Sequence, residues 1–270
     1  QPMKLAAMEG LYDGNVGQSL VAVGFVNPDK KPGDNLEAIK GEISIPYGLS
    51  ILANHDPNSF VPGINDLIEG RTITADGDTV YGDSYADRIV MGKAAREALA
   101  RYAEAKSSGD TAAMSRAKDD VMANFKYFGY GYLDSAEEAV PPVALTFYSF
   151  RVMVMAGGYL LLLFIALIFI CYRRKAVLEK PWLHWLGIIS VPVVWICSQA
   201  GWIVAEVGRQ PWVIQDLMPT RAAISGITTG SVQLTFWIFA VLFTMLLAAE
   251  ISIMLRYIGR ASHKNIEQPE

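Results

Sequence analysis

Residues 143–171 read VALTFYSFRVMVMAGGYLLLLFIALIFIC, an apolar run in which Arg151 is the one charged residue. The hydrocarbon core of a bilayer takes about 20 residues of helix, so this run is long enough to cross it. Two further apolar runs of sufficient length follow, at about 182–205 and about 231–255. We therefore predict an all-α membrane protein with three transmembrane helices, preceded by a partly helical region outside the membrane.

The chain before these runs is different in character, because it holds most of the charged residues. We therefore divide the sequence into a polar loop region, residues 1–140, and a membrane region, residues 141–270. Apolar residues recur at helical spacing within residues 85–105, which predicts an amphipathic helix. A second helix is expected over residues 112–133, with its end at Gly129 and Gly131.

Two other stretches of the polar region are typical of loops. Residues 27–42 are rich in Lys, Asp, Gly and Pro, and residues 73–84 read ITADGDTVYGDS. Both compositions favour turns over regular structure. We predict that both stretches are loops.

The composition excludes several classes of protein. Of the 270 residues, 52% are hydrophobic, and the net charge is only −4, which argues against a nucleic-acid partner. The two cysteines, Cys171 and Cys197, both lie in apolar runs, so neither a disulfide framework nor a zinc site is expected. The three histidines show no spacing typical of metal ligands.

The basic residues predict the orientation in the membrane, since Lys and Arg are enriched in cytoplasmic connections. They cluster after the first run and after the third: Arg173, Arg174, Lys175 and Lys180, then Arg256, Arg260 and Lys264. We expect both clusters to be cytoplasmic. Residues 1–140 would then be extracytoplasmic and the C-terminus cytoplasmic.

Charged residues also occur at the end of the second apolar run, where residues 201–212 read GWIVAEVGRQPW. Glu206 and Arg209 are three positions apart and Trp202 is four before Glu206, so the three share one face of a helix. A charge at membrane depth costs about 2.5–3.5 kcal/mol on insertion scales, and it is a candidate for function by default. The alternative is an interfacial anchor, with the tryptophans in the aromatic belt.

Two further residues near the ends of the runs allow two interpretations each. Met153 is either a packing residue or a thioether ligand to haem iron, and Arg151 beside it could balance a propionate. Glu250 is either a hydrogen-bonded carboxyl or part of a proton route from the cytoplasm.

Lys4 and Glu9 lie near the start of the chain, in QPMKLAAMEG. Five helical positions correspond to about 140°, so the two side chains would not form an ion pair but could line one cleft from different sides. Glu9 could accept protons from a hydroxyl substrate, and Lys4 could polarise an oxygen. The alternative is an ordinary solvated helix start.

Several motifs together resemble subunit I of the cytochrome bd quinol oxidases. GWIVAEVGRQPW resembles the family's GWxxxExGRQPW signature, and QPMKLAAMEG resembles the QPxKLAAxE opening of its quinol-binding loop. ISIPYGLSILA, FGYGYL and FYSFRVMV resemble further elements of the family, and all five occur in the family's order. The family's subunit I is longer, and its first part, which carries histidine ligands, has no counterpart here.

The resemblance implies roles for the residues singled out above. Met153 would be an axial ligand of the low-spin haem b, with Arg151 beside it. Glu206 would be a ligand of a high-spin haem or lie beside one, with Trp202 on the same helix face and Arg209 close to haem propionates. Lys4 and Glu9 would take part in quinol oxidation. The charges at membrane depth would then face an enclosed group of haems.

The resemblance further implies the C-terminal portion of a quinol:oxygen oxidoreductase in a bacterial cytoplasmic (inner) membrane. Electrons would pass from quinol through low-spin haem b to high-spin haem b and haem d, where oxygen is reduced to water. The expected partners are the N-terminal part of subunit I, subunit II, small accessory subunits and membrane quinol, and the fragment alone is expected to be inactive. The sequence leaves open a split subunit or a fragment, ubiquinol or menaquinol, and haem d or a third haem b.

A non-catalytic membrane scaffold or assembly subunit without haem remains the alternative function. A small transporter fits less well, because three helices provide no internal repeat and no pair of broken helices.

Overall fold

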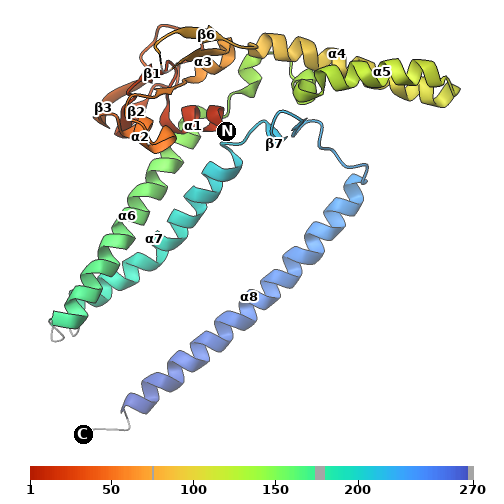
Figure 1. The fold of residues 1–270 in the computed structure, drawn as a ribbon. Helices are drawn as coiled ribbons and strands as arrows, with labels where there is room; N and C mark the ends of the chain where they lie inside the picture. Colours follow the sequence, from red (N-terminus) through yellow and green to blue (C-terminus); the bar gives the residue numbers. More distant parts are fainter. Residues whose placement is uncertain (75, 174–179, 267–270) are drawn as a thin grey trace. The chain divides into compact units, whose positions relative to one another are not determined.

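The computed structural model describes residues 1–74, 76–173 and 180–266. The chain forms two compact units, Gln1–Ala223 and Ile224–Glu270. The first contains the polar region and two long helices, and the second contains one long helix (Figure 1).

The three predicted transmembrane helices are present. They are α6 (Val143–Arg173), α7 (Pro181–Glu206) and α8 (Thr229–Ile266). Each is long and apolar enough to cross a membrane. The first two match the predicted bounds closely, whereas α8 continues beyond the apolar run into the polar residues that follow it. The all-α membrane fold predicted from hydropathy is confirmed.

Helices α6 and α7 lie side by side within the first unit (Figure 1). The hydroxyl oxygens of Tyr159 and Ser190 are 3.0 Å apart, and Cys197 Sγ donates a weak hydrogen bond to Met153 O over 3.4 Å. Gly201 brings the backbone of α7 close to α6: a Cβ there would lie 3.2 Å from Met153 Sδ. Small residues at such crossings are typical of helix pairs in membranes.

The polar region contains the predicted amphipathic helix as α4 (Tyr85–Ser108). Its start is capped by Ser84, which accepts a hydrogen bond from Asp87 N, and Asp87 Oδ2 in turn accepts one from Ser84 N. The helix ends at Gly109, whose φ of 75° suits a left-handed C-cap. The second predicted helix is only partly correct. Helix α5 spans Thr111–Asn124, and a 3₁₀ segment, η1 (Phe125–Tyr132), replaces the rest.

The tighter winding of η1 has a packing reason. Gly131 of η1 lies against Gly92 of α4 so closely that a Cβ on either glycine would collide with the other's backbone. Tyr130, between the two glycines of η1, is fully buried against Tyr85 and Trp212. A continuous α-helix over these residues would not place both the glycine contact and the tyrosine ring in this way.

The prediction that residues 27–42 and 73–84 are loops is wrong in part. Ile39–Glu42 belong to β3 (Ile39–Ile45), which pairs with β2 (Leu20–Val26). Residues 79–81 form β6 (Thr79–Tyr81), which pairs with β5 (Arg71–Ile73). The Gly and Asp residues mark only the connections between strands, while the β-branched residues beside them pair.

Shorter elements complete the first unit. Two more antiparallel pairs join β1 (Asn15–Val16) to β4 (Phe60–Val61) and β7 (Trp212–Ile214) to β8 (Met218–Pro219). The short helices are α1 (Pro2–Glu9), α2 (Gly48–Asn54), α3 (Ile64–Glu69) and η2 (Ala136–Ala139). Helix α1 packs against the start of α6, which brings the first residues of the chain to the beginning of a membrane helix.

Candidate functional site

A buried ion pair joins Glu9, at the end of α1, to Arg151 of α6. Arg151 Nη2 lies 2.9 Å from Glu9 Oε2, and the two side chains are 7% and 1% exposed. The same guanidinium donates to Met8 O over 2.6 Å and to Val21 O over 2.8 Å. Its Cζ lies 3.5 Å from the centre of the Phe147 ring. One arginine therefore fastens α1 and β2 to the membrane helix.

Only one of the two carboxylate oxygens of Glu9 is hydrogen-bonded within the described residues. Oε2 is bound to Arg151, whereas Oε1 is buried and has no hydrogen-bond partner among the described residues. Burial raises the pKa of Glu9, and the attraction of Arg151 offsets this rise only in part. A carboxyl with one open oxygen and a raised pKa is suited to accept a proton at that oxygen.

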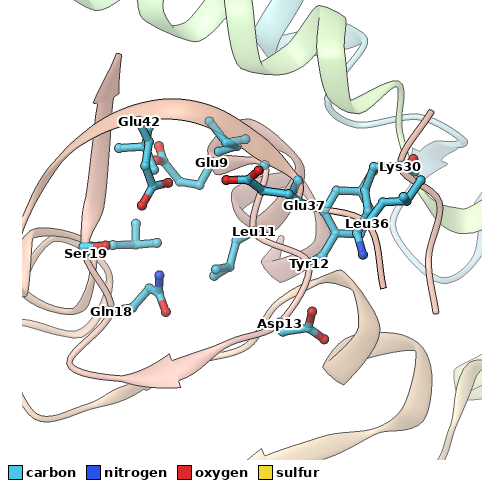
Figure 2. A pocket seen from close by; sticks show the side chains of 15 residues that line it. Glu9, Leu11, Tyr12, Asp13, Gln18, Ser19, Lys30, Leu36, Glu37 and Glu42 are labelled. Carbon is cyan, nitrogen blue, oxygen red and sulfur yellow. Dashed lines mark hydrogen bonds between the residues drawn. The ribbon is translucent and has the colours of Figure 1, made fainter. Parts of the chain in front are cut away.

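Glu9 lines a cavity of about 380 Å³ formed by the polar region (Figure 2). Two more carboxylates of its wall, Glu37 and Glu42, come from the β2–β3 hairpin. Lys30 also lines the cavity, but its Nζ lies 2.7 Å from Asp34 and over the Tyr12 ring. The cavity therefore contains more acidic than free basic groups. Glu37 and Glu42 were not predicted as site residues, since both lie in the stretch 27–42 that the sequence predicted as a loop.

Lys4 lies elsewhere, which corrects the expectation that it shares a cleft with Glu9. It lines a second cavity of about 210 Å³, together with Arg209. The reason lies in the helix geometry, because side chains about 140° apart on α1 point toward different neighbours. Glu9 pairs with Arg151. The aliphatic part of Lys4 packs against Gly208, where an added Cβ would lie 3.2 Å from Lys4 Cγ.

Within the chain itself, the partner of Arg151 is a carboxylate. Both terminal nitrogens are engaged by Glu9 and by backbone carbonyls. Nε is buried and has no hydrogen-bond partner in the described part of the chain. It is the one donor of this guanidinium that remains for a propionate.

The remaining candidates lie on α6, on α7 and just after α7. Met153 is partly buried and its sulfur faces Gly201 of α7. Trp202 is 63% exposed and Glu206, the last residue of α7, is exposed as well. Arg209 Nε is buried without a partner among the described residues. A thioether, a carboxylate and a guanidinium with an open donor are groups that haem iron and propionates accept.

The fit to haem is limited to these groups. Within residues 1–74, 76–173 and 180–266, no cluster of three or more His, Cys, Asp or Glu side chains could hold a metal ion. Met153 and Glu206 can each supply one iron ligand.

Replacing Arg151 with methionine tests the structural role of the ion pair. The variant leaves the Glu9 carboxylate and two carbonyls buried without their donor, which costs about 3–5 kcal/mol for a broken buried pair. We expect residues 1–26 to become sensitive to limited proteolysis in the membrane-embedded protein, while α6 remains inserted.

The matched control is Arg101→Met. Arg101 pairs with Asp120 at 3.0 Å, but both side chains are more than half exposed, so the loss is about 1 kcal/mol or less. Equal protease resistance of the Arg151 and Arg101 variants would contradict the proposed role of Arg151 in holding α1 and β2 against α6.

Comparison with known proteins adds to this geometry. The model of the family "Cytochrome bd terminal oxidase subunit I" matches residues 1–262. The "Cytochrome bd-II ubiquinol oxidase subunit 1" of Escherichia coli (strain K12) is 32% identical over 259 residues, which are 95% of this chain and 48% of that protein. The "Cytochrome bd ubiquinol oxidase subunit 1" of Bacillus subtilis (strain 168) is 28% identical over 268 residues, 98% of this chain and 43% of that protein.

A solved structure gives the same fold. The bd oxidase from Geobacillus thermodenitrificans matches with a TM-score of 0.56 and 23% identity, over 96% of this chain and 42% of that one. The chain thus spans about half the length of the curated relatives it matches. Because the family model covers nearly the whole sequence, the chain belongs to the cytochrome bd terminal oxidase subunit I family.

Proposed function

We propose that this chain supplies the quinol-oxidising region and the last three membrane helices of a terminal oxidase that oxidises membrane quinol and reduces oxygen to water. The observation that carries the proposal is the Glu9–Arg151 pair, with Glu9 Oε1 buried, open and at the wall of a cavity. Family membership supports the reaction class. The activity belongs to a larger complex, and this portion alone is inactive.

Glu9 acts as the proton acceptor in quinol oxidation. Oxidation of a quinol releases two protons and two electrons. Each hydroxyl proton passes in turn to Glu9 Oε1 and from there to water, and the two electrons would go one after the other to the low-spin haem b when it is bound. Arg151 binds Oε2 over 2.9 Å and so fixes the carboxylate's orientation. It also favours the ionised form that can accept a proton. Residues 1–140 form the region around this site.

Five residues face the haems. Met153 offers its thioether to the iron of low-spin haem b, and Glu206 offers its carboxylate to the iron of a high-spin haem. Arg209, with its open Nε, and Trp202, on the same helix face as Glu206, contact the high-spin haem. Arg151 adds its Nε donor near low-spin haem b. When bound, haem b and haem d supply the electron transfer and the oxygen chemistry.

The chain lies in the bacterial cytoplasmic membrane, with residues 1–140 extracytoplasmic and the C-terminus cytoplasmic. The three apolar helices support a multi-pass protein. Much of the basic connection after α6, residues 174–179, lies outside the described residues, and the orientation rests on its sequence. The partners are the N-terminal part of subunit I, subunit II, small accessory subunits and membrane quinol.

Replacing Glu9 with glutamine tests the proton acceptor. Without a base at this position, quinol turnover of the assembled oxidase falls by about 100-fold or more, while the haem spectrum is retained. The pH profile of the parent has an acidic limb, because protonation of Glu9 removes the base as the pH falls through its pKa. Since burial raises that pKa, the limb lies above the ordinary glutamate value of about 4.3.

The residual turnover of Glu9→Gln is expected to have a pH profile without the acidic limb. Glu97→Gln, on the exposed face of α4, is the control and keeps the parent's turnover and pH profile. A Glu9→Gln enzyme with normal turnover and an unchanged acidic limb would remove Glu9 from the reaction.

Replacing Met153 with leucine tests the iron ligand. Leucine has a similar size, so the change costs less than about 1.5 kcal/mol in packing and the subunit still assembles. The optical and EPR signals of low-spin haem b are lost or shifted in Met153→Leu, and the other haem signals remain. Met155→Leu is the matched control, because Met155 is on the same helix but 56% exposed and points elsewhere. Parent-like spectra of Met153→Leu would exclude the thioether as ligand.

A further inference from the structure

The proton that Glu9 accepts has no direct route to bulk water. The side chain of Glu9 is 1% exposed, and its open oxygen, Oε1, is buried at the wall of the cavity of about 380 Å³, hereafter the Glu9 cavity. Arg151, which binds the other oxygen, is not an acceptor, since an arginine side chain stays protonated. Glu9 has to lose each proton before it accepts the next. The proton therefore has to leave through the Glu9 cavity.

The charged groups of this cavity differ in what they are bound to. Besides Glu9, they are Asp13, Lys30, Glu37 and Glu42. Lys30 is engaged in an ion pair at 2.7 Å, and Asp13 accepts a hydrogen bond from Asn65 Nδ2 over 2.7 Å. The ion pairs of the described residues include neither Glu37 nor Glu42, and both residues are exposed. These two carboxylates are therefore the groups that remain to accept a proton.

The β2–β3 hairpin contains an irregularity next to Glu42. The partners across the hairpin on its two sides are Val23–Ile43 and Phe25–Lys40. Two steps along β2 thus match three steps along β3, and Gly41, within the longer segment, has a φ of 60°. An extra residue beside a glycine in the left-handed region is a β-bulge, which redirects the side chains that follow it and is common next to active sites.

The bulge explains how Glu42 comes to line the cavity. Ile39 and Glu42, three positions apart, both line it, whereas residues an odd number apart in a regular strand point to opposite faces. The extra residue between them cancels the alternation. Across the hairpin, a Cβ on Gly24 would lie 3.6 Å from Glu42 Cβ and would collide with Ile39 Cγ2. Glycine at this position leaves room for both side chains.

Glu42 connects the buried carboxylate to solvent. Figure 2 shows Glu9, Glu37 and Glu42 on one side of the cavity and Lys30 on the other. The volume of about 380 Å³ is many times the roughly 10–15 Å³ that one water needs, so water has room to bridge the carboxylates. A carboxylate that lines the cavity and is also exposed can take a proton from this water and give it to bulk solvent.

We propose that Glu42 receives the proton of Glu9 through water in the cavity and releases it to bulk solvent, with Glu37 as a second acceptor on the same wall. This inference rests on the proposed function and deepens it. In the step, the O–H bond at Glu9 Oε1 breaks, its proton passes by way of water to the carboxylate of Glu42, and Glu9 is again a carboxylate. No electron moves. The two protons of each quinol follow this route one after the other.

The test uses the assembled oxidase with Glu42→Gln, Glu42→Asp and the double variant Glu37→Gln/Glu42→Gln. Asp29→Asn is the control, because Asp29 is an exposed carboxylate of the same hairpin connection that does not line the cavity. Three quantities are measured for each: kcat and KM for a short-chain quinol, the ratio of kcat in H₂O to kcat in D₂O, and kcat in sodium acetate against sodium chloride of equal concentration.

In Glu42→Gln, kcat is expected to fall by about 10-fold or more, because a proton-transfer group is lost, and it falls further in the double variant. The KM for quinol stays at the parent's value. The solvent isotope ratio rises, because proton release becomes rate-limiting. Acetate restores part of kcat, since a small carboxylate enters the cavity and carries the proton in place of Glu42. Glu42→Asp and Asp29→Asn are expected to behave as the parent.

Three results would overturn the inference: a parent-like kcat in the double variant, a fall in kcat with neither a larger isotope ratio nor acetate rescue, and a raised KM with an unchanged kcat. The second would give Glu42 a purely structural role, and the third would place it at the quinol. Glu9→Gln tells this failure from that of the proposed function. If Glu9→Gln is slow and the double variant is parent-like, only the relay is wrong, whereas normal turnover in Glu9→Gln contradicts the proposed function itself.

Discussion

The guanidinium of Arg151 is the constraint on which the polar region depends. A charge near the beginning of a membrane helix is costly unless it is paired and hydrogen-bonded. Arg151 meets this requirement with partners from outside α6: the carboxylate of Glu9, the carbonyl of Met8 and the carbonyl of Val21. The same contacts that satisfy the charge hold α1 and β2 in place. They also leave one oxygen of Glu9 open at a cavity, so packing and proposed chemistry share one residue.

A second group of contacts fixes the other side of α1. Tyr130 is buried between Tyr85 and Trp212 and donates to Asp216, while Gly129 N donates to Asp216 O over 2.9 Å. This cluster joins η1 to the turn that follows α7. That turn brings Arg209 to the cavity that Lys4 also lines. Glu9 and Lys4, five positions apart on one short helix, therefore belong to different cavities with opposite charge.

The sequence predicted the features that depend on neighbouring residues. The transmembrane helices followed from the length of the apolar runs, and α4 followed from its helical spacing. The strands β3 and β6 were missed, because Gly and Asp in their connections gave a stronger signal than the few β-branched residues that pair.

The Glu9–Arg151 pair joins residues 142 positions apart, so no spacing rule could have found it. Helix geometry predicted that Lys4 and Glu9 point in different directions, but the expectation of one shared cleft was wrong, because the neighbours of α1 decide which cavity each side chain meets. The roles of Met153, Trp202, Glu206 and Arg209 at haem stay predictions.

A double-mutant cycle with Glu9→Gln and Arg151→Met, measured on the assembled oxidase, tests the central role of the ion pair most directly. The cycle compares the free energy of unfolding, or the melting temperature where unfolding is irreversible, for the parent, both single variants and the double variant. Each single variant leaves one buried charged group without its counter-charge, whereas the double variant removes both charges. The account predicts a coupling of about 0.5–3 kcal/mol, with the double variant less destabilised than the sum of the two. Additive effects would show that Glu9 and Arg151 do not depend on each other and would contradict the account.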